Sequence, residues 1–103
     1  MDYQLVLQIA GDSLPHYDVM IEVEGRLIEA IGDVGEVDGH DIGSGEANIF
    51  ILTTRPEAAF LRAKVVLEDL DLIDHIKAAY RLTAGETYTV IWPSDSRSQF
   101  SVT

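Results

Sequence analysis

The 103-residue sequence contains no cysteine, and no apolar run in it approaches the ~20 residues of a membrane-spanning helix. Without cysteine the chain forms no disulfide, no thiolate zinc site and no cysteine nucleophile. The first residues lack the basic region and cleavage site of a secretion signal. With 47% hydrophobic residues, this length predicts one soluble, cytoplasmic α+β domain over 1–93 and a polar tail over 94–103.

Basic residues are also scarce, because seven Lys and Arg stand against 18 Asp and Glu, for a net charge of −11. Residues 1–53 hold eleven of these acids and a single base, Arg26. A field of this sign repels the phosphates of nucleic acids but attracts a basic protein and accelerates its encounter. Excess charge also favours solubility, so the charge alone does not establish a partner.

Alternating and continuous apolar patterns predict five strands. Residues 3–9 alternate apolar and polar side chains, which is typical of a half-buried strand. Residues 34–42 indicate a short polar strand, and 46–53 a strand with four consecutive apolar residues, which belongs in the interior of a sheet. Residues 76–82, predicted to point Ile76, Ala78, Tyr80 and Leu82 inward, and residues 87–92 form a final hairpin.

The stretch from 17 to 33 fits either a helix or a hairpin that turns at Glu24 and Gly25. Gly25 weakens a helix interior, and Glu24 falls within the apolar arc. Glu-Gly is not a favoured hairpin pair, however, so we favour the helix. Its apolar face would comprise Tyr17, Met20, Ile21, Leu27, Ile28 and Ile31.

A second helix is predicted after residue 53. Thr54 can cap it together with Glu57, and Pro56 lies in the first turn, where its missing N–H is tolerated. Its core-facing stripe would comprise Phe60, Ala63, Val66, Leu67 and Leu70.

The element order is therefore β-α-β-β-α-β with an additional C-terminal strand, which matches a ferredoxin-like two-layer α+β sandwich. Helices on one side of such a sheet leave its second face open. That face would carry Val6, apolar residues of 49–52 and part of 87–92. We expect a second copy of the chain to cover it in a homodimer, or the tail over 94–103 to fold across it.

The glycine-rich segment 37–51 contains the most plausible ligand residues, Asp38, His40, Asp41 and Glu46. A calcium loop starting at Asp38 is disfavoured, because its bidentate glutamate position falls on Ile49. On a strand, Asp38 and His40 would face one side and Asp41 the other, so a third ligand would have to come from Glu46 or from His75. A phosphate cradle is also disfavoured, because the glycines lead into a strand. We favour a tight turn here, and predict no metal, cofactor or catalytic residue.

Two further residues are candidates for ligand binding. Glu24, among apolar neighbours, would act as a general acid or base if it were buried, or would simply lie at the edge between helix and sheet. His75 follows Asp74 and is expected at the surface beside that carboxylate.

The run DGHDIGSGEANIFILT, followed by PEAAF, resembles small bacterial proteins of an uncharacterised family with an α+β pattern. The resemblance is best over 37–60 and implies no activity, cofactor or site residue. The chain departs from that pattern at Thr53-Thr54-Arg55, where an acidic helix cap is expected, and this departure changes the local charge.

The sequence leaves three functions open. The first is a small acidic, non-catalytic interaction protein that either blocks a basic partner, as immunity proteins and inhibitors do, or self-associates. The alternative is a small-ligand- or metal-binding domain, or an enzyme, that uses 38–46 with Glu24 or His75. A regulatory small-molecule domain is suggested by fold analogy alone.

Overall fold

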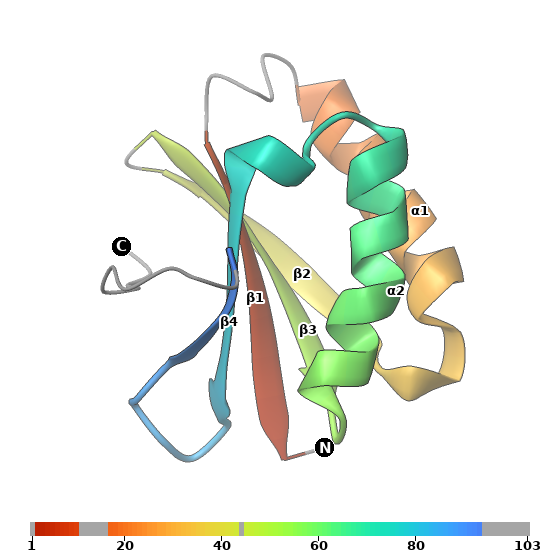
Figure 1. Cartoon of the computed structure of the whole chain (residues 1–103). Helices are drawn as coiled ribbons and strands as arrows, with labels where there is room; N and C mark the ends of the chain where they lie inside the picture. Colours follow the sequence, from red (N-terminus) through yellow and green to blue (C-terminus); the bar gives the residue numbers. More distant parts are fainter. Residues whose placement is uncertain (1, 11–16, 44, 94–103) are drawn as a thin grey trace.

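A computed structural model describes residues 2–10, 17–43 and 45–93 and shows two layers, a sheet with both helices on one of its faces (Figure 1). The elements are β1 (Tyr3–Ala10), α1 (Tyr17–Ile31), the 3-10 turn η2 (Gly32–Val34), β2 (Glu36–Gly43), β3 (Glu46–Thr53), α2 (Pro56–Asp69), the 3-10 turn η3 (Ile73–His75), β4 (Ile76–Leu82) and β5 (Thr89–Trp92). The predicted α+β class is confirmed. The predicted tail 94–103 lies outside the described residues.

The sheet has five strands in the order β2-β3-β1-β4-β5, and each neighbouring pair is antiparallel. β1 is the central strand, and β3 is interior, as its apolar run predicts. β5 is an additional strand on the outer side of β4, as the sequence predicts, although it begins at Thr89 rather than at residue 87.

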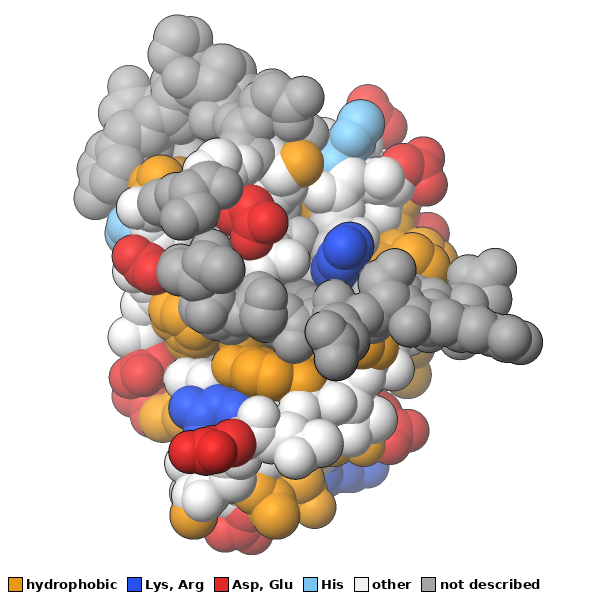
Figure 2. Space-filling view, turned by 90° about the vertical axis from the view of Figure 1, so that its left-hand side faces the viewer, with side chains coloured by type: hydrophobic (Ala, Val, Ile, Leu, Met, Phe, Trp, Pro, Cys, Tyr) orange, Lys and Arg blue, Asp and Glu red, His pale blue; other side chains and the backbone are white. Residues whose placement is uncertain are grey.

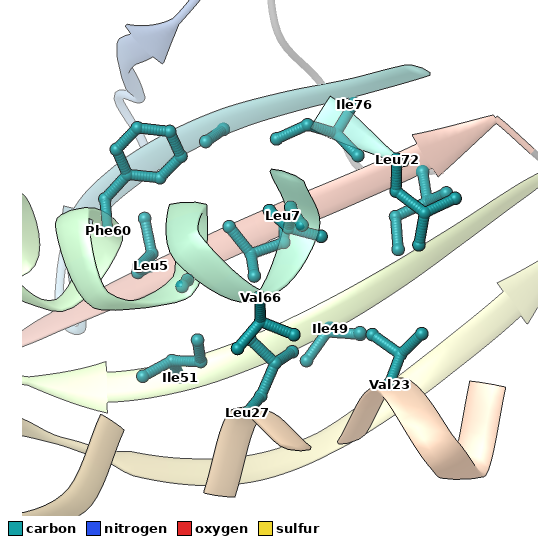
Figure 3. Packing of buried hydrophobic residues seen from close by; sticks show 14 of the residues in the cluster. Leu5, Leu7, Val23, Leu27, Ile49, Ile51, Phe60, Val66, Leu72 and Ile76 are labelled. Carbon is teal, nitrogen blue, oxygen red and sulfur yellow. The ribbon is translucent and has the colours of Figure 1, made fainter. Parts of the chain in front are cut away.

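The hydrophobic core lies between the sheet and the two helices (Figure 3). Leu5 of β1 lies opposite Ile51 of β3, and Leu7 lies opposite Ile49. All four side chains are fully buried. Burial of each such side chain contributes about 1.5–3 kcal/mol of favourable free energy, so these two cross-strand pairs are a substantial part of the hydrophobic core.

The helix predicted in the first half of the chain is confirmed, but part of its predicted buried face is wrong. Ile21 and Ile28 are 47% and 59% exposed, whereas Val23 is buried. Only a stripe spaced by three and four residues can contact a flat sheet, and the apolar arc of α1 is wider than that stripe. The side chains that form the contact are Met20, Val23, Leu27 and Ile31.

α2 begins at Pro56, as predicted, and its stripe over Phe60, Ala63, Val66 and Leu67 is buried. The predicted cap by Thr54 and Glu57 is wrong, because no side chain caps this helix. Thr53, one residue earlier, takes over the local hydrogen bonding. Its hydroxyl accepts from Arg55 N–H at 2.9 Å and donates to the carbonyl of Val34 at 2.6 Å. Neither helix has the length and apolar character needed to span a membrane, within the part of the chain that is described.

Trp92 connects β5 to α2 and η3. Its indole N–H donates to the carbonyl of Ile73 at 3.1 Å, and its ring centroid lies 6.0 Å from that of Phe60. The Nζ atom of Lys64 lies 4.7 Å from the Trp92 ring centroid, within cation–π range. Leu82, predicted to point inward, is instead 54% exposed because it ends β4 at the margin of the core.

The substitution Leu7→Ala tests this core. Leu7 is fully buried, so we expect its truncation to lower the free energy of unfolding by about 3 kcal/mol through lost burial and an unfilled cavity. The matched control is Leu61→Ala, at a side chain that is 64% exposed, with an expected change within about 0.5 kcal/mol. Chemical denaturation followed by circular dichroism measures both, and equal losses would contradict the assigned core.

Candidate functional site

The glycine-rich segment forms the turn and bulge of the β2–β3 hairpin. Gly43 pairs with Glu46 across the turn, and Gly45 has φ +76°, which glycine adopts without strain. Gly39 has φ +140° at a β-bulge where the register shifts between Val37 and Gly39. The predicted tight turn is therefore present, and a bulge that the sequence analysis did not predict lies before it.

Two of the predicted site residues meet directly. His40 lies opposite Ile49, whose side chain is in the core, so the imidazole points towards α1. There its Nδ1 atom lies 2.6 Å from Oε1 of Glu24, and the two side chains are only 21% and 14% exposed. Glu24 thus lies at the edge between helix and sheet. A carboxylate on Nδ1 fixes the orientation of an imidazole.

The other predicted site residues do not join this pair. Asp41 lies opposite Asn48 on the second face of the sheet, and Glu46 lies on that face as well. Asp38 is exposed at the bulge, and His75 is exposed in η3, next to β4. Within the described ranges, no three histidine or acidic side chains gather in the manner of a metal site.

Figure 2 looks onto the second sheet face, where hydrophobic and charged side chains are both visible. A row of polar residues crosses this face. By register, the row runs through Asp41, Asn48, Gln8 and Lys77. Gln8 Nε2 donates to Asn48 Oδ1 at 3.1 Å. Sequence reasoning missed this contact, and the signal for it was an asparagine inside the apolar strand 46–53.

Two atoms near this row are buried without a hydrogen-bond partner in the described structure, Nδ2 of Asn48 and Oε2 of Glu46. Asn48 is only 1% exposed. Both atoms are enclosed within the fold, so they form no accessible binding site in this structure. The ligand-binding alternative for 38–46 stays a prediction.

A different surface combines exposed apolar and acidic side chains, and we name it the α1–β2 edge. Ile21 and Ile28 flank Glu24 on α1 by three and four residues, so they share the helix side that faces His40. Ile42, two residues after His40, shares its side of β2 and is 54% exposed. The edge comprises exposed Ile21, Ile28, Glu29, Asp33, Glu36, Asp38, Asp41 and Ile42.

Two arginines make their contacts outside this edge. Arg26 reaches from α1 to α2, where its Nη1 atom lies 2.8 Å from Oδ2 of Asp69. Arg81 Nη1 donates to the carbonyls of Leu82, Thr83 and Gly85 at 2.9–3.0 Å and so closes the β4–β5 loop. The sequence contains no Lys or Arg between Arg26 and Arg55. The segment 27–54, which supplies every carboxylate of the α1–β2 edge, therefore adds no lysine or arginine of its own to this surface.

Comparisons with models of protein families, with curated proteins and with solved structures each gave no match. The resemblance of 37–60 to small bacterial proteins stays a prediction.

A double-mutant cycle tests the contact between Glu24 and His40. Because the pair is hydrogen bonded and mostly buried, we expect Glu24→Ala and His40→Ala to couple by about 1 kcal/mol in the free energy of unfolding. The control cycle combines Glu29→Ala with His75→Ala, two exposed residues on separate elements, and should couple by less than about 0.5 kcal/mol. Coupling no larger than the control value would show that the pair does not hold α1 to β2.

Proposed function

We propose that the protein is a non-catalytic interaction module that binds a basic protein segment through the α1–β2 edge. One observation carries this proposal. Exposed isoleucines on α1 and β2 lie among exposed carboxylates, and the segment 27–54 that supplies these carboxylates contains no lysine or arginine. Surfaces of this composition attract a partner by charge and retain it by apolar burial.

The two kinds of side chain contribute differently. Ile21, Ile28 and Ile42 are each about half exposed, and burying the remainder of each side chain contributes on the order of 1 kcal/mol. The carboxylates accelerate association and disfavour acidic competitors, and salt screens their effect within about 10 Å at 0.1 M. Binding should therefore weaken with salt but not vanish, because apolar burial is not screened.

We also propose that the fold is a ferredoxin-like variant. The order of strands and helices along the chain supports this assignment, as does the placement of both helices on one sheet face. The edge strand β5 makes the sheet order differ from that of a four-stranded motif.

The homodimer predicted through the second sheet face stays a prediction. Val6 and Ala79, at the centre of that face, are each 0% exposed within the single chain. These two residues offer a second copy little apolar area, whereas Phe50 and Leu52 on the same face are partly exposed.

Charge reversal on the edge tests the proposed function. The probe is a nine-residue peptide of alternating lysine and leucine, and its affinity is measured by calorimetry at low and at moderate salt. We expect the variant Asp38→Lys with Asp41→Lys to bind at least about tenfold more weakly, a loss of about 1.4 kcal/mol. The reason is that the introduced lysines repel the lysines of the peptide, whereas the native carboxylates attract them.

The matched control is Glu68→Lys with Glu86→Lys, which changes net charge equally at exposed residues outside the edge. Its affinity should fall less than about threefold. Equal losses in the two variants, or no binding of the peptide at low salt, would contradict the proposal.

A further inference from the structure

We infer that the segment bound at the α1–β2 edge is an extended strand that pairs with the outer side of β2 and alternates basic with aliphatic residues. This inference rests on the proposed function and specifies the partner of the same surface.

The backbone of β2 is available for such pairing. β2 is the first strand in the sheet order, and within the described residues it pairs only with β3. In an antiparallel strand, alternate residues direct their N–H and C=O groups away from the existing neighbour. An extended peptide adds to an edge of this kind through main-chain hydrogen bonds and gains specificity from alternate side chains.

The side chains of β2 sort by charge between the two faces of the sheet. His40 and Ile42 lie on the side of α1, where Ile21 and Ile28 are also exposed. Glu36 and Asp41 lie opposite Leu52 and Asn48, on the second face.

A strand added to β2 would continue this division, because its own side chains alternate between the same two faces. Aliphatic side chains would therefore fall beside the isoleucines, and lysine or arginine beside the carboxylates. Each favourable cross-strand pair contributes roughly 0.2–1 kcal/mol. The partner is thus a segment in which aliphatic residues alternate with lysine or arginine. A net positive charge alone would not require this alternation.

A second copy of this chain does not fit the same edge. Pairing β2 with β2 would bring the carboxylates of Glu36, Asp38 and Asp41 beside those of the other copy, and like charges on adjacent strands destabilise a sheet. The bulge between Val37 and Gly39 also limits regular pairing to residues 39–43, and bulges of this kind protect natural sheet edges from indiscriminate association. The edge therefore fits a short, basic, foreign strand.

Backbone N-methylation of the lysine–leucine probe peptide tests whether the peptide pairs with β2 as an added strand. In one peptide all leucine amides are methylated, and in the other all lysine amides are methylated. Successive amides of a strand point to opposite edges, so one peptide loses the hydrogen bonds to β2 and the other keeps them. We expect one peptide to bind at least tenfold more weakly than the other. Equal affinities of the two methylated peptides would overturn the inference.

Hydrogen exchange of the full chain provides a second readout. The unmethylated peptide at saturation should slow amide exchange within 39–43 at least tenfold, with little change in β5, the edge strand at the other side of the sheet. Protection absent from 39–43, or equal in β5, would overturn strand addition.

These outcomes separate the two proposals. If the unmethylated peptide fails to bind, or if Asp38→Lys with Asp41→Lys leaves its affinity unchanged, the proposed function itself is wrong. If binding depends on those carboxylates but the two methylated peptides bind equally, only the inference of strand addition to β2 is wrong. Protection of 39–43 that appears without peptide, together with a doubled mass in sedimentation, would identify a second copy as the occupant and overturn the foreign strand.

Discussion

The packing of the β1–β3 ladder under the two helices sets the positions of nearly all other side chains. With Leu5 opposite Ile51 and Leu7 opposite Ile49, a slip by one residue would move every core side chain of a strand to the other face. The register of β3 then sets that of β2 through a short turn. As a result, His40 points to Glu24 and Asp41 points away. The distribution of charge at the α1–β2 edge thus follows from apolar packing in the core.

The strands, the helices and the class of fold could be predicted because each leaves a local pattern. Alternation identifies β1, the continuous apolar run identifies β3, and Pro56 marks the start of α2. What could not be predicted depends on residues far apart in the sequence. The hydroxyl of Thr53 replaces the expected cap because the carbonyl of Val34 lies within its reach, and no local pattern reports that contact.

The candidate site shows the same division. Its turn was predictable from Gly45, but the bulge at Gly39 was not, because it arises from pairing with β3. That bulge breaks the simple alternation that would have placed Asp38 and His40 side by side. Which isoleucines of α1 remain exposed also depends on where the helix contacts the sheet. The sequence pattern does not determine which apolar residues of each helical turn form that contact.

The excess of acidic residues in the first half of the chain places carboxylates beside exposed apolar side chains. Arg26 and Arg81 are engaged by Asp69 and by the β4–β5 loop, so the acidic half of the chain presents carboxylates beside exposed apolar groups. Solubility alone would explain the carboxylates, since charge keeps proteins apart, but it would not explain three exposed isoleucines in the same place.

Nuclear magnetic resonance mapping of the labelled chain, titrated with the lysine–leucine peptide, tests the central claim most directly. α2 carries an internal comparison in Leu61 and Val65, which are 64% and 65% exposed. Our account predicts the largest shift changes at Ile21, Ile28 and Ile42, with Leu61 and Val65 unaffected. Changes centred on α2, or on β4 and β5 at the other side of the sheet, would contradict it.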